Sequence, residues 1–460
     1  MLSVGFVTGV WAAQFIQLFG LSWLVFPAIL VIGLARRWLF LPAYVVAAVV
    51  GVSYGSLEKS RVAEVNGFVG RTVQITGTIR EDVGTISGKK KSLQLSNWQV
   101  NTRAGPGNVW LSVSGQDIKR GDRVTVAGVA GHGFGSFALV LQNARLISIE
   151  RPFPGDVGRI VRDWFAAVVR RGIAEPAASL GIGFLTGQKS TMPADIAESL
   201  RIAGLSHIIV ASGYNLTILV RLARRLFVNK SKHLSMTTAF IMIFSFVMIT
   251  GLSPSMTRAG IVSSLSLLTW AYGRTIHPFV LLSLVAAITV LIQPSYVWGD
   301  LGWQLSFAAF FGVMVVGPLL QKFFFDDESP GAIRQILGET IAAHIVTVPI
   351  VALSFGAMSQ VAIFANLSIV PFVPLAMLLT FLSGVVSLIL PPLANLAGLP
   401  AQWLLQSMIE VATKLAALPW SQTNWAPTVV ALLIYYSLLA VACYVMWRTT
   451  QHRLVDYQII

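Results

Sequence analysis

Long apolar runs alternate with short polar connections along most of this chain. A membrane-spanning helix needs about 20 mostly apolar residues. Runs of this kind predict about ten spans, with candidates at 3–19, 21–35, 38–56, 204–226, 236–252, 257–273, 278–293, 302–320, 338–355, 361–390, 396–418 and 427–447. No small-residue cleavage site follows the first run, so we expect a retained first helix and not a cleaved signal peptide.

Residues 57–150 follow a different pattern, because apolar and polar residues alternate there with a period of two. Such alternation predicts strands, and glycine-rich turns separate them. The alternating segments lie at 71–79, 91–100, 108–114, 122–130 and 137–149. Five strands of this spacing predict a small antiparallel barrel. The OB-fold is one such barrel, although spacing alone does not separate it from other small barrels.

The segment after the strands predicts short helices that do not span. DVGRIVRDWFAAVVRRGI (156–173) is amphipathic, which predicts an interfacial helix with a basic wet face. Its polar side carries Arg159, Arg162, Asp163 and Arg170, and its apolar side carries Ile160, Val161, Trp164, Phe165, Val168 and Val169. ASLGIGFLTGQ (178–188) is apolar but too short to span, so we expect a re-entrant helix buried in protein. PADIAESLRIAG (193–204) predicts a short helix that starts at Pro193.

The apolar run GLSHIIVASGYNLTIL (204–219) carries more polar groups than a lipid-facing helix accepts. They include Ser206, His207, Ser212 and Asn215, and Gly213 is a candidate break. Polar residues at membrane depth mark a transport pathway by default, whereas small residues and hydroxyls also join helices without any further role. For Ser206 and Ser212 alone we would favour helix packing, but His207 and Asn215 favour a pathway.

Three later runs are interrupted in a similar way. An arginine inside a span costs several kcal/mol unless it is paired or hydrated, and prolines break a helix. The polar residues of these runs are Arg258 in GLSPSMTRAGI, Asp300, Gln304 and Ser306 in WGDLGWQLSF, and Asn366 in FANLSIVPFVP. A charge pair of Arg258 with Asp300 would satisfy both groups and would be a purely structural explanation of them.

Composition supports a membrane protein and limits its chemistry. The chain is 55% hydrophobic and 11% charged, whereas soluble domains carry about 25% charged residues. Cys443 is the single cysteine, so an intrachain disulfide and a cysteine-based zinc site are excluded. The sequence contains no HExxH, HxHxDH or GxxxxGK[ST] motif. We therefore expect no metal, no cofactor and no ATP site.

The formal net charge of +14 has two explanations. Lys and Arg gather on the cytoplasmic side of membrane proteins, which places the N-terminus and the C-terminus in the cytoplasm and residues 57–150 outside. That outer region is itself basic, because residues 66–150 hold ten Lys or Arg and five Asp or Glu. The positive-inside rule does not explain this excess, and a basic surface also attracts nucleic acid.

The outer region therefore provides candidate contacts to nucleic acid. The candidate cations are Lys89, Lys90, Lys91, Arg103, Lys119, Arg120, Arg123 and Arg145, and the candidate stacking residues are Trp98, Trp110, Phe134 and Phe137. Cations follow a phosphate backbone while aromatic rings stack on bases. The alternative is ordinary structure, in which strand aromatics fill the core and turn lysines are solvated.

Four stretches occur in a fixed order: LTGQKSTMPADIAESLRIAGLSHIIVASGYNLTIL, SPSMTRAGIV, LGWQLSFAAFFG and FANLSIVPFVP. Together they resemble the competence domain of the ComEC family, and with the preceding barrel the resemblance covers nearly the whole chain. In the family pattern His207 matches the first histidine, Ser212-Gly213 the SG pair, Arg258 the arginine of PSxxRA, and Gln304 and Ser306 the QLS.

The resemblance implies a bacterial inner-membrane channel that passes one strand of transforming DNA into the cytoplasm. It implies single-stranded DNA, membrane lipid and other competence proteins as partners, namely a DNA receptor, a cytoplasmic ATP-driven motor and a separate nuclease; a homo-oligomer is left open. We expect a polytopic α-helical membrane protein with broken or re-entrant helices and an inserted OB-like β-barrel. The expected division is 1–57 for N-terminal transmembrane helices, 58–150 for the OB-like domain, 151–203 for interfacial and re-entrant helices, 204–447 for the channel and 448–460 for a cytoplasmic tail.

Two features depart from the family pattern. Asn215 stands where the family usually has a second histidine, which argues against a titratable role at that position. Many members end with a metallo-β-lactamase-like domain thought to degrade the other strand, but this chain has no HxHxDH motif and stops after its last apolar run. We therefore expect a transport protein and not an enzyme, with either a separate nuclease or a truncated nuclease domain.

Two other functional classes fit parts of the sequence. A secondary transporter of a small solute or ion would use the same broken helices. It predicts inverted repeats, which we do not find, and it leaves the basic barrel unexplained. A membrane-embedded hydrolase would use Ser212 as nucleophile and His207 as base, but the two lie on poorly matched faces of a helix and no acidic partner is evident.

Overall fold

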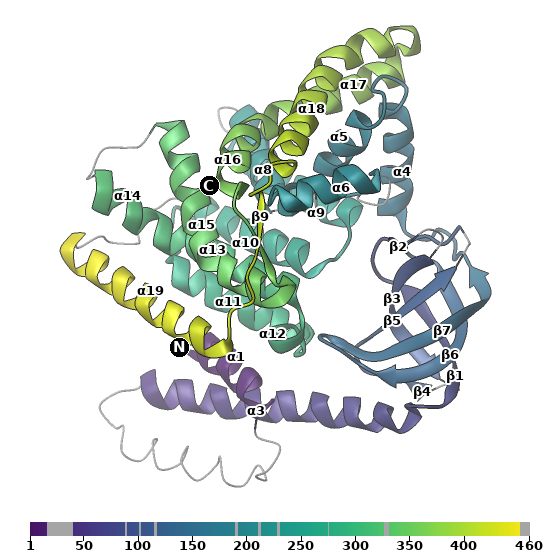
Figure 1. Cartoon of the computed structure of the whole chain (residues 1–460), viewed down its shortest axis with the longest axis vertical. Helices are drawn as coiled ribbons and strands as arrows, with labels where there is room; N and C mark the ends of the chain where they lie inside the picture. Colours follow the sequence, from purple (N-terminus) through teal and green to yellow (C-terminus); the bar gives the residue numbers. More distant parts are fainter. Residues whose placement is uncertain are drawn as a thin grey trace. The chain divides into compact units, whose positions relative to one another are not determined.

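The computed structural model describes most of the chain. It covers residues 1–15, 40–87, 90–100, 103–114, 117–188, 192–209, 213–227, 231–274, 276–325 and 331–450. Ser212, Lys89 and the predicted span 21–35 lie outside the described residues. Within them the protein is mostly helical, with one β-barrel and one two-stranded sheet (Figure 1).

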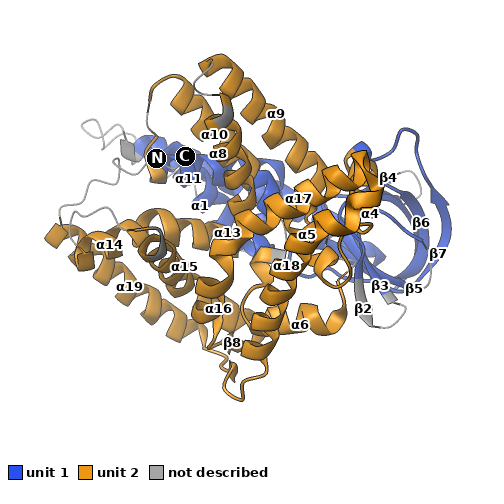
Figure 2. Ribbon diagram, turned by 90° about the horizontal axis from the view of Figure 1, so that it is seen from above, with its two compact units in different colours: residues 1–157, 251–258, 279–304 blue, residues 158–250, 259–278, 305–460 orange. Residues whose placement is uncertain are grey.

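The elements form two compact units (Figure 2). Unit 1 comprises residues 1–157, 251–258 and 279–304, and unit 2 comprises residues 158–250, 259–278 and 305–460. The helices α10 (Pro254–Ala271) and α13 (Leu301–Phe311) begin in unit 1 and continue in unit 2.

Two helices near the N-terminus pack through glycines. α1 (Leu2–Ala12) and α3 (Phe40–Val65) each carry a GxxxG spacing, Gly5 with Gly9 and Gly51 with Gly55. A β-carbon on Gly9 would lie 2.0 Å from the carbonyl oxygen of Ala48, so only glycine allows this approach. Small residues at this spacing let membrane helices pack backbone to backbone.

The alternating region forms a single seven-stranded sheet, in unit 1. The five predicted strands are present, and their inward side chains form a common core with Trp98 at its centre. Two short strands are added, one between the first two predicted strands and one between the second and third. The strands are β1 (Thr72–Ile79), β2 (Gly84–Ser87), β3 (Lys90–Val100), β4 (Arg103–Ala104), β5 (Asn108–Ser114), β6 (Arg123–His132) and β7 (Phe137–Glu150).

The five long strands close into a barrel. β1 pairs with both β3 and β6, β3 with β5, β5 with β7, and β7 with β6, so no long strand has a free edge. The β5–β7 pairing is parallel and the others are antiparallel. The expected domain start at residue 58 is too early, because α3 continues as a helix to Val65 and η1 (Asn66–Phe68) follows it.

The remaining elements are helices and one small sheet. Unit 1 also contains α11 (Pro278–Ile292) and α12 (Tyr296–Gly299). Unit 2 contains α4 (Val157–Val169), α5 (Ala177–Thr186), α6 (Ala194–Ile202), α7 (Ser206–Ile209), α8 (Gly213–Phe227), α9 (Lys232–Thr250), the π-helical turn η2 (Gly312–Val316), α14 (Gly317–Phe325), α15 (Ala332–Phe355), α16 (Ala362–Ile369), η3 (Val370–Phe372), α17 (Val373–Ile389), η4 (Pro391–Leu393), α18 (Ala394–Ala416), α19 (Val429–Thr450), and β8 (Ala357–Ser359) paired with β9 (Gln422–Asn424).

Five helical stretches in the described part of the chain are long and apolar enough to cross a membrane. They are Lys232–Thr250, Leu301–Phe325, Arg334–Phe355, Ala362–Ile389 and Val429–Thr450. The predicted count of about ten spans stays a prediction. The short helix α5 is buried along nearly its whole length, which agrees with the expected re-entrant helix.

The helix α4 corrects one prediction. Its basic side is not uniformly wet, because Arg162 is buried and forms an ion pair with Asp163 at 3.1 Å. The apolar residues Ile160, Val161 and Trp164 are exposed instead. This orientation suits a helix beside lipid, where charged groups turn inward to partners and apolar side chains face outward.

Candidate functional site

The polar run 204–219 contributes two described helical segments to unit 2, α7 (Ser206–Ile209) and the start of α8. Residues 210–212 between them lie outside the described residues. Asn215, in the first turn of α8, is fully buried, and its side-chain amide donates to the carbonyl oxygen of Phe184 at 3.0 Å. Because Phe184 belongs to α5, this bond ties α5 to the start of α8.

His207 lies on α7, before the segment 210–212. Its imidazole hydrogen-bonds to the backbone of Gly204, and His344 of α15 is close enough to act on it electrostatically. Gly204 has φ 75°, a left-handed conformation that favours glycine. A β-carbon on Gly204 would lie 2.6 Å from Cβ of Ala362, so the turn before α7 packs directly on the start of α16.

The helical geometry changes after Asn366, within the stretch Ala362–Ile389. The helix α16 gives way to η3 at Val370, and α17 resumes at Val373, as the prolines of FANLSIVPFVP predict. Asn366 is buried, and its Oδ1 has no hydrogen-bond partner among the described residues. A buried amide oxygen without a partner costs about 1–3 kcal/mol, so its retention points to a role other than stability.

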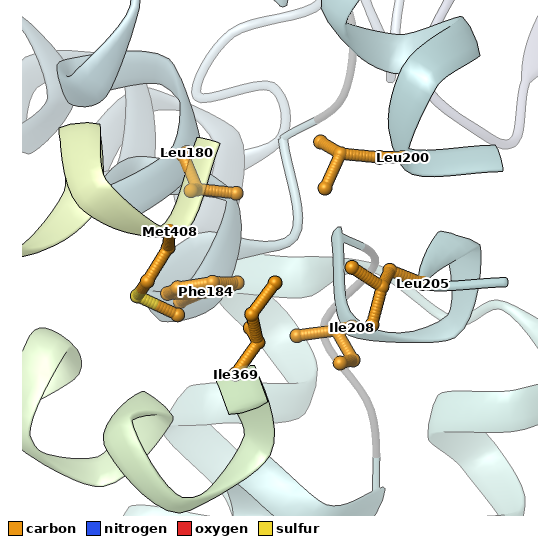
Figure 3. Close-up of a pocket in the computed structure, with 7 residues that line it drawn as sticks. All are labelled: Leu180, Phe184, Leu200, Leu205, Ile208, Ile369 and Met408. Atoms are coloured by element: carbon orange, nitrogen blue, oxygen red, sulfur yellow. The ribbon is translucent and has the colours of Figure 1, made fainter. Parts of the chain in front are cut away.

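An apolar cavity lies where these short helices meet. Its lining side chains point into one common space (Figure 3) and come from α5, α6, α7, α16 and α18: Leu180, Phe184, Leu200, Leu205, Ile208, Ile369 and Met408. The cavity volume is about 10 Å³, about what one water needs, and apolar cavities stay dry. No nucleotide fits there, so this part of unit 2 is closed in the described conformation.

The other predicted pathway residues lie on α10 and α13. Arg258 is buried at 9% exposure in the part of α10 that belongs to unit 1. Asp300 and Gln304 also lie in unit 1, whereas Ser306 lies in unit 2 and is half-buried. The structure therefore divides the predicted pathway between the two units, with His207, Asn215, Ser306 and Asn366 in unit 2.

Asp300 has a local role that the sequence pattern did not reveal. Its Oδ1 accepts a hydrogen bond from the backbone N–H of Trp303 at 2.6 Å, which caps α13. The side-chain amide of Gln304 donates to the carbonyl oxygen of Val297 at 3.1 Å. The pair of Arg258 with Asp300 is not among the ion pairs of the described residues.

Arg80 joins the barrel to the segment before Asp300, within unit 1. Its guanidinium donates to the phenolic oxygen of Tyr296 at 2.7 Å and to Oε1 of Gln293 at 3.1 Å. A third, longer contact of 3.4 Å reaches Oδ1 of Asn108 on β5. These contacts join the barrel to the segment that precedes Asp300. Both belong to unit 1, which also contains Arg258 and Gln304.

Two of the predicted nucleic-acid contacts are wrong, because their side chains are buried. Trp98 is 1% exposed in the barrel core, and its indole N–H donates to the carbonyl oxygens of Pro106 and Gly107. Arg120 is 4% exposed and its Nε donates to Asp156 at 2.6 Å. Neither side chain can reach a base or a phosphate from the surface.

Trp110 has the opposite environment. It points outward from β5, is half-buried, and packs edge-on against Phe134 with ring centroids 5.9 Å apart. Phe134 lies in the β6–β7 loop, is 55% exposed, and contacts Phe137 at a centroid distance of 5.3 Å. These three rings form an aromatic cluster on the outside of the barrel.

The remaining predicted cations have mixed environments. Arg103, Arg123 and Arg145 are exposed, Lys91 is half-buried, and the side chain of Lys90 is not described. Lys119 lies 3.6 Å from Asp117. Beside the β6–β7 loop, unit 1 has a cleft of about 310 Å³ whose lining includes His132, Ser136, Phe137, Ser295 and Trp298.

Several residues at these sites were missed from the sequence. His344 had a signal, since it is a histidine inside the apolar run 338–355. Arg80, Gln293 and Tyr296 had none, because they meet only through tertiary packing. Among the described residues no group of acids, histidines and cysteines is arranged to hold a metal ion.

One comparison with known proteins gives a match. A family model described as "Competence protein" matches residues 184–449, more than half of the 460-residue chain. The match starts in α5 and ends in α19, so it includes His207, Asn215, Arg258 and Asn366. Comparisons with curated proteins and with solved structures give no match.

Proposed function

This chain belongs to the competence protein family, and from that membership we propose that it forms an inner-membrane channel for single-stranded transforming DNA. The strand would enter the cytoplasm through this channel during natural competence. Family membership itself supports a role in DNA uptake. The channel and the single-stranded substrate are the finer part of the proposal, and they rest on the observations below.

Buried polar side chains carry the proposal. Asn215 near the start of α8 and Asn366 before η3 are buried in unit 2, and Arg258 is buried near the start of α10. Hydrocarbon penalises such groups, and broken helices at membrane depth persist only inside protein or along a wet cavity. A path for a hydrophilic solute explains why several of them occur in one protein.

The barrel supports nucleic acid as that solute. We assign it to the OB class, because its five long strands close in the order first, second, third, fifth, fourth, with the third and fifth parallel. OB-folds bind oligonucleotides on strands 2 and 3 and on the loop between strands 4 and 5. Trp110 lies on the third barrel strand and Phe134 lies in that loop, so the aromatic cluster stands on the expected binding face.

The proposal also specifies location and partners. We place the protein in the bacterial inner membrane as a multi-pass protein with both termini in the cytoplasm, because its loop cations then lie inside. It would act as a transport protein and not as an enzyme. Energy and strand degradation would come from partners, namely a cytoplasmic ATP-driven motor and a separate nuclease, with a DNA receptor outside.

Internalised labelled DNA in cells that lack this gene tests the proposal. We expect loss of cytoplasmic single strand while surface-bound duplex is retained. His207→Ala and Arg258→Ala should each abolish uptake without loss of membrane-inserted protein, whereas the exposed controls His233→Ala and Arg334→Ala should not. Unchanged uptake in the deletion strain would favour a small-solute transporter, and normal transformation by both pathway variants would remove His207 and Arg258 from the path.

A further inference from the structure

A cluster of cations surrounds Trp270 at one end of three consecutive helices of unit 2. We call it the Trp270 cluster; it comprises Arg224 on α8, Lys232 at the start of α9, Trp270 on α10, and Arg221, which precedes Arg224 on α8 and acts on it electrostatically. The guanidinium carbon of Arg224 lies 4.2 Å from the centre of a Trp270 ring, and Nζ of Lys232 lies 5.7 Å from it. Both cations are therefore held against the same indole.

The cations of the cluster form no ion pair among the described residues. The sequence has no Asp or Glu between Glu198 and Asp300, although Glu339 of α15 acts electrostatically on Tyr214, as Arg221 does. Nε of Arg224 is buried and has no hydrogen-bond acceptor in the described part of the chain. Like charges gathered without a counter-ion repel one another, and an added anion would relieve that repulsion.

Apolar side chains continue along the helix from the charges. Lys232 begins a helix that is long and apolar enough to span a membrane. Further along the same helix, Leu234, Ile241 and Phe244 are exposed. α10 packs on α9, because a β-carbon on Gly260 would lie 3.0 Å from a methyl group of Val247. The surface is therefore amphiphilic, with cations at one end of an apolar helix.

We propose that the Trp270 cluster binds the phosphate of an anionic phospholipid, whose acyl chains lie along α9. Charge selects an anion, and the exposed apolar side chains below the charges suit acyl chains better than a nucleic acid. The indole of Trp270 already contacts two cations, which leaves it poorly placed to stack on a base. Basic residues beside tryptophan at helix ends also occur where lipid headgroups lie.

This inference does not rest on the proposed channel function. Lipid bound at the Trp270 cluster would bridge α8 and α9 by neutralising cations on both helices, beside Trp270 of α10. The fold of unit 2 would then depend on anionic lipid whether or not DNA passes through the protein. The two ideas can fail separately.

Native mass spectrometry of the full chain in detergent tests the lipid site, with phosphatidylglycerol and phosphatidylcholine as probes. We expect tighter binding of phosphatidylglycerol, and weakening by added salt because the contact is ionic. The variant Arg221→Gln/Arg224→Gln/Lys232→Gln should weaken phosphatidylglycerol binding by about fivefold for each cation removed. The control Arg334→Gln/Lys414→Gln/Arg448→Gln removes three exposed cations elsewhere in unit 2 and should bind like the parent.

Three results would overturn the proposal. They are equal binding of the two lipids by the unmodified protein, unchanged phosphatidylglycerol binding by the triple variant, and displacement of phosphatidylglycerol by a dT20 oligonucleotide from the parent and from the control alike, since both retain the cluster. The last result would assign the cluster to nucleic acid. If the triple variant does not fold, the two-lipid comparison and its salt dependence on the unmodified protein decide the question.

Discussion

Burial separates residues of the same type that the sequence presents as equivalent. Trp98 and Trp110 both lie on alternating strands of one barrel, yet Trp98 fills the core and Trp110 faces outward against Phe134. The same holds for the arginines, since Arg120 is buried on Asp156 while Arg123 is exposed. At the scale of single residues, roles follow from environment rather than from residue type.

The two tryptophans should therefore respond differently to truncation. Trp98→Ala should destabilise the barrel by about 3–5 kcal/mol, because it removes a fully buried aromatic side chain. Trp110→Ala should leave unfolding unchanged and weaken binding of single-stranded DNA by about 1–3 kcal/mol for each base that stacks there. Chemical unfolding and fluorescence anisotropy with labelled dT20 measure the two effects. Undiminished DNA binding by Trp110→Ala would exclude the aromatic cluster from the interface.

Replacing Asn366 should change stability and DNA uptake in opposite directions. Asn366→Leu removes a buried oxygen that has no partner among the described residues, so we expect a melting temperature equal to or above that of the parent. DNA uptake should fall, because the substitution removes the buried polar group that precedes η3. Melting in detergent and transformation frequency measure this.

Thr380→Val provides the control for Asn366→Leu. Thr380 is also buried, but its hydroxyl already donates to the carbonyl oxygen of Ala376 at 2.7 Å. Loss of this hydrogen bond in Thr380→Val should lower the free energy of unfolding by about 1 kcal/mol and leave DNA uptake intact. Normal uptake by Asn366→Leu would show that Asn366 is not needed for transport.

At the scale of elements, close approach depends on glycine. The α1–α3 pair has glycines at matched positions on both helices, and a β-carbon on Gly51 would lie 2.2 Å from the carbonyl oxygen of Phe6. The α5–α8 region uses a different device, in which Asn215 bonds to the backbone of Phe184. Both devices join elements that lack enough polar side chains to be held by ion pairs.

Gly51→Leu should separate α1 from α3. The added side chain meets backbone atoms, which cannot move aside as a flexible side chain would, so we expect loss of α1 protection from proteolysis. Leu57→Ala on the exposed side of α3 should have no such effect. Limited proteolysis in detergent, followed by mass spectrometry of the N-terminal peptide, measures the difference, and equal protection in both variants would contradict this packing.

At the scale of the whole molecule, chain segments far apart in sequence share one unit. Unit 1 combines the barrel with residues 251–258 and 279–304, and Arg80 supplies contacts to the second of these. Gly135 in the β6–β7 loop also packs closely on Gly299. A β-carbon added to Gly135 would lie 2.6 Å from the carbonyl oxygen of Gly299. Movements of the barrel and of the segment that carries Asp300 are therefore expected to be coupled.

Arg80→Met tests this coupling. The substitution keeps an unbranched apolar stem but removes the guanidinium, so Gln293 and Tyr296 lose their donor, and a hydrogen bond to a charged group contributes about 1.5–3 kcal/mol. Hydrogen exchange of residues 293–299 should become faster, while Arg123→Met on the exposed side of β6 should leave it unchanged. Equal exchange in the parent and in Arg80→Met would show that Arg80 does not hold the two segments together.

The sequence alone determined the kinds of element and much of their order. All five alternating segments form the expected strands, the short run 178–188 contains a buried helix, and the prolines after Asn366 coincide with the 3-10 turn η3 between α16 and α17. These features are local, because periodicity, run length and proline act on neighbouring residues. The competence family was also predicted from local motifs and is confirmed by the match to residues 184–449.

Only the tertiary structure decided which side chains face each other. Arg80 meets Tyr296 across 216 positions of sequence, and Arg120 is removed from the surface by Asp156, 36 positions away. The inward turn of Arg162 on α4 also depends on what packs against that helix. Such outcomes follow from burial and pairing between distant segments, and no local pattern contains that information.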